Sequence, residues 1–153
     1  MGRAELIENL NKALSLEWSG VIQYRQHSFL VTGIEREVYR DFFADQAEEA
    51  QDHANSLGDK IVALGGIPTV EPALIRQSVD LKEMLSQNLE LEREAIKAYL
   101  AAWASCDDED LPTKFELEGR IAEEQRHVEE LEKLTLERQA NIAKERIVLR
   151  QIS

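Results

Sequence analysis

Prolines and glycines divide this chain into four long stretches. The breaks fall at two single residues and two short clusters: Gly33, Gly65-Gly66, Pro68 with Pro72, and Pro112. Proline disrupts a helix interior and glycine commonly ends a helix, so the stretches between breaks are helix candidates. No stretch alternates apolar and polar residues as a half-buried strand does. The sequence therefore predicts four helices, at about residues 3–31, 34–64, 80–105 and 113–151.

The ends of these stretches set the order of the helices in space. Two of them begin with capping-box patterns, Asp80-x-x-Glu83 and Thr113-x-x-Glu116. The connections at Thr32-Gly33 and Cys106–Pro112 are short, so each joins antiparallel neighbours. Gly65–Val79 is long enough to run the length of a helix. We therefore expect one all-α domain over residues 1–153, an antiparallel four-helix bundle with a long crossover between its second and third helices.

Charge and composition narrow the class of protein. The chain has 30 Asp and Glu against 18 Lys and Arg, a formal net charge of −12, which favours cations over nucleic acid as partners. A hydrophobic fraction of 43% is too high for an acidic disordered chain, and no apolar run is long enough to cross a membrane. Charged residues interrupt the first twelve positions, so we expect no signal peptide. Cys106 is the single cysteine, which predicts a cytoplasmic protein without disulfides.

Each predicted helix carries an ionisable residue in the middle of its apolar stripe. Steps of three and four residues place Glu17 on the first stripe, His53 on the second, Glu92 on the third, and Glu124 beside His127 on the fourth. A buried carboxylate is costly unless it is paired or bound to a metal. In the antiparallel order these residues converge at one depth, where such side chains build di-iron or di-manganese sites. Iron, manganese and zinc all accept these ligands.

Taken one at a time, these residues also have ordinary structural interpretations. Glu17 can be a solvated residue at the edge of the stripe, and His53 can be a hydrogen-bonded core histidine. Tyr24 alone is typical of core packing. His27 lies off the apolar stripe, so we expect it at the surface or at a contact with another subunit.

Several motifs resemble the bacterioferritin branch of the ferritin-like superfamily. Similar segments occur in all four predicted helices and together span almost the whole chain: Leu10–Glu17, Gln23–His27, Asp52–Ala54 with Leu64–Pro68, Leu91–Ile96, and Glu123–His127. The resemblance implies a ferritin-like bundle with a di-iron centre. It also implies these roles: Glu17 and His53 bind one iron, Glu92 and His127 bind the other, Glu124 bridges them, and Tyr24 lies close by without binding.

The sequence departs from the family pattern at three places. Family members have a bridging Glu three residues before the second-helix histidine, and this chain has Ala50 there. Glu49 lies four residues before His53 and can share its helix face, so it is a candidate sixth ligand. Haem-binding members have Met where this chain has Gln51, so we predict no haem. The family's break before a short fifth helix is absent from residues 134–151, which puts a 24-subunit cage in doubt.

The leading functional hypothesis is a ferroxidase-type oxidoreductase that binds Fe(II), oxidises it with dioxygen or peroxide, and serves iron storage or detoxification. We expect self-association, as a dimer or a cage of 24 subunits. One alternative is a di-metal peroxidase or oxidase without storage. Another is a metal-poor structural bundle. A DNA-protecting mini-ferritin is disfavoured, because the first turn at Gly2–Glu5 lacks a basic extension.

Overall fold

The computed structural model describes residues 2–135, 146–148 and 150–151 and contains four long helices. A short 3₁₀ turn, η1, precedes the last of them. The helices and the turn are α1 (Arg3–Leu30), α2 (Arg36–Ala63), α3 (Leu81–Ala104), η1 (Asp108–Asp110) and α4 (Leu111–Thr135). The predicted all-helical bundle with one long loop is therefore confirmed.

The helix ends agree with the expected caps at one place and differ at another. Asp80 caps α3 by accepting a hydrogen bond from the backbone N–H of Glu83. The predicted cap at Thr113 is wrong, because α4 already begins at Leu111 and Thr113 is buried inside it. Pro112 does not stop this helix, since the first turn needs no N–H from that position. The predicted continuation of the fourth helix to residue 151 lies outside the described residues at 136–145 and 149.

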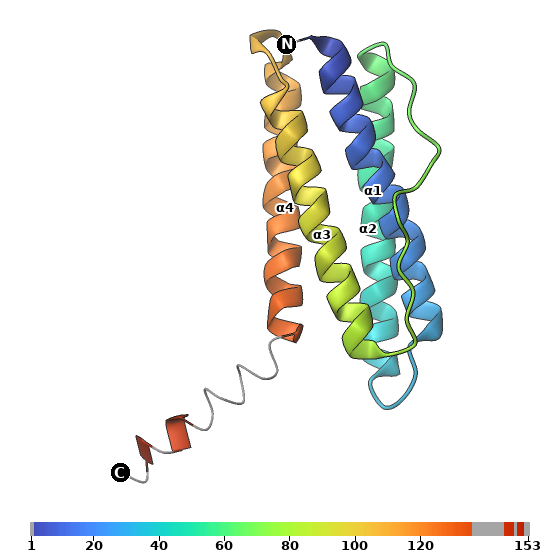
Figure 1. The fold of residues 1–153 in the computed structure, drawn as a ribbon, viewed down its shortest axis with the longest axis vertical. Helices are drawn as coiled ribbons and strands as arrows, with labels where there is room; N and C mark the ends of the chain where they lie inside the picture. The colour runs from blue at the N-terminus through green and yellow to red at the C-terminus, as the bar shows by residue number, and fades with distance from the viewer. Residues whose placement is uncertain (1, 136–145, 149, 152–153) are drawn as a thin grey trace.

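In Figure 1, α1 and α4 run downward and α2 and α3 run upward, which is the predicted order with one crossover. The first turn depends on Gly33, whose φ of 89° lies in the left-handed region. After α2, Gly65 has a φ of 90°, and the chain then passes close to α1. A Cβ atom at Gly66 would lie 2.6 Å from Ile7 Cγ2 and 3.0 Å from Ile61 Cγ2, so a larger residue here would force these side chains to move.

The crossover between α2 and α3 lies along α1 (Figure 1) and is held there by side chains of that helix. Asn11 both donates to the Ile67 carbonyl oxygen, at 3.1 Å, and accepts from the Thr69 N–H, at 2.8 Å. Further along α1, Ser19 donates to the Leu74 carbonyl oxygen at 2.8 Å. These bonds satisfy backbone groups that have no helix or sheet partner.

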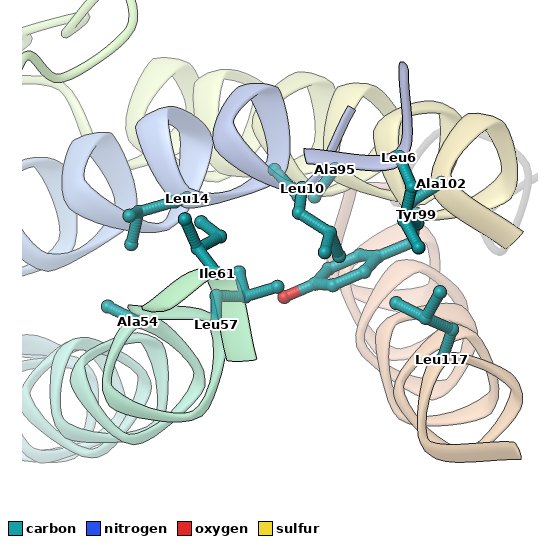
Figure 2. Close-up of a cluster of buried hydrophobic side chains, with 11 residues drawn as sticks. Leu6, Leu10, Leu14, Ala54, Leu57, Ile61, Ala95, Tyr99, Ala102 and Leu117 are labelled. Carbon is teal, nitrogen blue, oxygen red and sulfur yellow. The ribbon is translucent and has the colours of Figure 1, made fainter. Parts of the chain in front are cut away.

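Two apolar clusters fill the bundle, one toward each end. One joins the first half of α1 to the second half of α2, and Figure 2 shows its side chains pointing into the space between the helices. Leu6, Leu10 and Leu14 are fully buried there. The other cluster includes Tyr24, Phe43, Met84 and Leu131. On every helix the predicted ionisable residues fall between the stretches that supply these two clusters.

The expectation that His27 lies at the surface is wrong. Its side chain is fully buried, with Nε2 3.2 Å from Gln87 Oε1 and its ring 5.6 Å from the ring of Phe43. Burial lowers the pKa of His27 below its usual value. Helix α1 packs against α2, α3 and the crossover, so little of its surface is free. A single apolar stripe marks one buried face and does not show that the other faces are covered as well. Among the described residues, no helix is long and apolar enough to cross a membrane.

Candidate metal centre

Four helices bring their ionisable side chains together midway along the bundle. On one side, His53 of α2 lies between two carboxylates, with Nδ1 3.3 Å from Glu17 Oε1 and 3.0 Å from Glu124 Oε1. All three residues are buried. Their ligand atoms lie within 4.8 Å of one another, which is close enough to hold one metal ion.

A second group of three lies on the other side of Glu124. His127 Nδ1 is 3.6 Å from Glu124 Oε2 and 3.9 Å from Glu92 Oε2. These ligand atoms also lie within 4.8 Å of one another. The two oxygens of Glu124 therefore face different histidines, and this carboxylate belongs to both groups.

Glu49 and Glu123 lie beyond the two histidines. Glu49 Oε1 is 3.1 Å from Nε2 of His127 and 3.9 Å from Nε2 of His53. Glu123 Oε2 is 3.0 Å from Nε2 of His53. The structure thus brings Glu49 to the site, but next to the ring nitrogens opposite those that face Glu124. Position 50 offers no ligand, because Ala50 is a buried methyl group beside Gly20.

Two tyrosines make reciprocal hydrogen bonds to the carboxylates of α1 and α3. Tyr24 of α1 donates to Glu92 Oε1 at 2.7 Å, and Tyr99 of α3 donates to Glu17 Oε1 at 2.8 Å. Tyr24 therefore lies beside the ligand cluster, where the resemblance placed it. In both helices the tyrosine follows the glutamate by seven residues, or about two helical turns.

Sequence reasoning did not assign Tyr99 or Glu123 to this site. The repeated Glu-x6-Tyr spacing on α1 and α3 is a signal that could have identified Tyr99. Glu123 had no comparable signal, because it directly precedes Glu124 in an acidic stretch. Only the packing of α4 against the bundle shows which acids point toward His53.

The carboxylates stabilise the protonated form of the histidines, and the histidines stabilise the ionised form of the carboxylates. Burial raises the pKa of Glu17, and burial together with the nearby charge of Glu124 raises the pKa of Glu92. Burial opposes the charged form of His53, but hydrogen bonds to Glu124 and Glu17 outweigh it and raise its pKa to about 10. Burial also opposes the charged form of His127, but the nearby carboxylates of Glu124, Glu49 and Glu92 raise its pKa. In the absence of metal, protonated histidines therefore compensate the buried carboxylates.

Among the residues that the structure describes, none is a hydrogen-bond partner of the buried atoms Glu124 Oε2 and His127 Nδ1. Such atoms cost free energy unless something else satisfies them. Carboxylate oxygens with one imidazole nitrogen on each side form a donor set suited to iron, manganese or zinc. The residues present thus fit a pair of metal ions that share Glu124, with Glu17 and His53 on one side and Glu92 and His127 on the other.

Comparisons with known proteins identify the fold. The family model for the ferritin-like domain matches residues 7–139. A structure of ferritin-like, diiron-carboxylate proteins from Bacillus anthracis str. Ames has 37% identity and a TM-score of 0.83, over 88% of this chain and 99% of that one. The dodecameric thioferritin of Bacteroides fragilis, a bacterioferritin-related protein, has 28% identity and a TM-score of 0.81, over 95% of this chain and 92% of that one.

A curated relative matches a shorter segment. The nutrient stress-induced DNA-binding protein of a Synechococcus strain is 35% identical over 69 residues, which is 45% of this chain but only 39% of the relative. The chain thus spans about two fifths of that protein's length.

The family model covers most of the chain, and the bundle and its buried carboxylate–histidine clusters agree with it: this chain belongs to the family of ferritin-like domains.

Proposed function

We propose that this protein binds Fe(II) at the centre formed by Glu17, His53, Glu92, Glu124 and His127, and oxidises it. The oxidant is dioxygen or peroxide, and the purpose is iron storage or detoxification. The observation that carries the proposal is the position of Glu124, whose two oxygens face His53 and His127 from between them. One shared carboxylate brings two iron ions close enough to act on the same oxidant.

The surrounding residues suit this task. Two adjacent Fe(II) ions supply two electrons, and hard carboxylate oxygens favour the Fe(III) that results. Tyr24 holds Oε1 of Glu92, which leaves Oε2, the oxygen that faces His127, for a metal. Tyr99 holds Oε1 of Glu17, the oxygen that also faces His53, and so fixes the orientation of that carboxylate. Apolar clusters lie above and below the centre, and the carboxylates of Glu17, Glu92 and Glu124 are buried between them.

The proposal is tested by adding Fe(II) to metal-free protein in air and following Fe(III) formation optically. We expect oxidation faster than in buffer and saturation near two iron ions per chain, as a shared carboxylate predicts. A folded protein that oxidises iron no faster than buffer would contradict the proposal. Metal analysis after iron soaking separates the alternatives: an empty site would favour a metal-poor structural bundle. Turnover of peroxide without iron retention would favour a di-metal redox enzyme.

Storage further requires assembly, and we propose that the chain self-associates. The relative from Bacteroides fragilis is described as dodecameric. The resemblance to bacterioferritins points instead to a dimer or a cage of 24 copies. Light scattering measures the mass of the particle, and division by the chain mass of 17.5 kDa counts the copies. A dimer would leave no cavity for stored iron and would favour the redox-enzyme alternative.

We also propose that nucleic acid is not a partner, although the curated relative is named a DNA-binding protein. The net charge of −12 opposes the counterion release that drives binding to phosphates. A gel-shift assay with duplex DNA at low salt tests this. A stable complex that dissociates as the salt concentration is raised would contradict the absence of a nucleic-acid partner.

Metal binding is expected to release protons and to strengthen as pH rises. The metal-free protein holds protons on its histidines, since the pKa of His53 is about 10 and that of His127 is also raised. A metal needs a free lone pair on the ring, so the metal-bound state holds fewer protons, and raising the pH favours it. Calorimetric titration with Zn(II) in two buffers of different ionisation enthalpy measures the protons released. An affinity that does not change between about pH 6 and about pH 7.5 would contradict this expectation.

A further inference from the structure

The two histidines have the same arrangement of partners. His53 directs Nδ1 toward Glu17 and Glu124 inside the bundle, and its Nε2 lies 3.0 Å from Glu123. His127 directs Nδ1 toward Glu92 and Glu124, and its Nε2 lies 3.1 Å from Glu49. In each ring, Nδ1 thus faces two carboxylates inside the bundle, and Nε2 faces a third, outer carboxylate, which is Glu123 for His53 and Glu49 for His127.

A histidine that binds a metal has one nitrogen for the metal and one N–H for another partner. The neutral ring has a single lone pair, and whichever nitrogen keeps the proton cannot bind. A carboxylate at Nε2 accepts that N–H, so the lone pair stays on Nδ1. For both rings Nδ1 is the nitrogen that faces the shared Glu124.

We infer that Glu123 and Glu49 are positioning residues, which fix the rings of His53 and His127 with Nδ1 toward the metals. This inference rests on the proposed metal-binding function. It gives Glu49 a place outside the pair of metals, so the bridging oxygen missing at Ala50 is not replaced. The centre then holds its metals with one shared carboxylate, Glu124.

The surroundings of Glu123 support a fixed role. Arg120, one turn earlier on α4, donates from Nη1 to Glu123 Oε2 at 3.2 Å. The same oxygen contacts His53, so the arginine holds the carboxylate at the ring. Glu123 also lines a groove of about 570 Å³ between α2 and α4. It therefore connects the buried histidine to the solvent side of the bundle.

The competing possibility is that His53 binds a metal through Nε2, on the side of Glu49 and Glu123. Glu49, Glu123 and Nε2 of His53 have ligand atoms within 4.8 Å of one another, so they form a third group of possible metal ligands. A neutral ring has one lone pair, so His53 cannot bind one metal through Nε2 beside Glu49 and Glu123 and another through Nδ1 beside Glu17 at the same time. The structure of a metal-loaded crystal decides between the two directions.

The first test is diffraction from crystals of the full chain loaded with Zn(II). We expect anomalous peaks at about 2.0–2.1 Å from Nδ1 of both histidines, with Nε2 of each directed to its outer carboxylate. Zinc bound to Nε2, with Glu49 or Glu123 as ligands, would overturn the inference but not the presence of a metal site. Wild-type protein that takes up no metal would contradict the proposed function as well.

The second test compares variants on α4 by equilibrium Zn(II) competition. Glu123→Ala is expected to weaken binding by about 10- to 100-fold, with the His53 ring turned or disordered in the crystal and the His127 ring unchanged. Glu123→Gln keeps an acceptor for the N–H, so it should restore the ring and most of the affinity. Glu116→Ala is the matched control, because Glu116 lies seven residues earlier on the same helix face, is exposed, and pairs with Lys60 rather than with a histidine in the described part of the chain.

The corresponding variant on α2 tests the other ring. Glu49→Ala should disturb the His127 ring and leave His53 in place, whereas Glu48→Ala, at an exposed neighbouring residue that pairs with Arg25, should disturb neither. If Glu123→Ala or Glu49→Ala binds zinc like its control with unchanged rings, the positioning role is wrong. Loss of a metal ion without any change in the ring would instead make the outer carboxylate a ligand.

Discussion

Glu124→Gln is expected to abolish tight binding at both metal positions. The substitution keeps the size of the side chain but removes the charge and one of the two oxygens that face His53 and His127. Even partners that only orient a ligand are worth about 10- to 100-fold in metal affinity, so a shared ligand should cost about 100-fold or more. Zn(II) or Fe(II) titration with metal analysis measures the affinity and the number of ions bound.

The same substitution should leave the fold intact. A neutral amide at position 124 removes repulsion from the buried carboxylates Glu17 and Glu92 as well as attraction to His53 and His127, so the two changes offset each other in the metal-free protein. Glu130→Gln is the matched control, because it is exposed on α4 and pairs only weakly with Lys133. It should bind metal like the wild type. A folded Glu124→Gln protein that still binds two ions with wild-type affinity would show that this carboxylate is not shared.

Leu10→Ala is expected to destabilise the bundle by about 2–5 kcal/mol, as other large-to-small changes in well-packed cores do. Leu10 of α1 is fully buried in the apolar cluster that also contains Leu57, Tyr99 and Leu117, and Figure 2 shows its side chain beside Tyr99. The rigid helices on either side cannot close the cavity completely. The measurement is the free energy of unfolding of metal-free protein in urea or guanidinium chloride, at a fixed protein concentration.

A matched control separates burial from helix propensity. Leu100→Ala makes the same chemical change on α3, where the side chain is 46% exposed. It should cost less than about 1 kcal/mol, since Leu100 is already nearly half exposed to solvent and its truncation leaves no closed cavity. Equal losses for the two variants would mean that the apolar cluster around Leu10 contributes little to stability. An unchanged midpoint for Leu10→Ala would contradict the tight packing of this end of the bundle.

The helices could be predicted because their signals are local. Proline and glycine stop helices through the backbone itself, and apolar residues at three- and four-residue steps mark the buried face. The start of α4 was predicted wrongly for the same reason. Pro112 was read as a break, but a first-turn proline is compatible with a helix when the preceding turn, here η1, leads directly into it.

The candidate site could be predicted in part, because buried charge is conspicuous on an apolar stripe. Glu17, His53, Glu92, Glu124 and His127 were all expected at one level, and the structure brings them together. Their depth follows from helix lengths and from antiparallel order. The side of the histidines on which Glu49 lies does not follow from spacing, since residues three and four apart share a helix face.

His27 and Tyr99 show what the one-dimensional pattern misses. His27 is off the stripe of α1 and yet fully buried, because α3 and its Gln87 cover that side. Tyr99 reads as one more apolar residue on α3, and only its hydroxyl contact with Glu17 gives it a place at the site. Both assignments depend on which helices are neighbours and on how they are rotated.

The sequence by itself determined the four helices, the long crossover, the acidic character and the depth at which the ionisable residues meet. These properties follow from backbone sterics, periodicity and net charge, which act within one segment or over the whole composition. The tertiary structure alone decided that the two oxygens of Glu124 face different histidines, that the two tyrosines bond reciprocally, and that Glu49 and Glu123 face Nε2 of the histidines. Contacts of this kind depend on helix rotation and side-chain rotamers, which are set by packing against all neighbours at once.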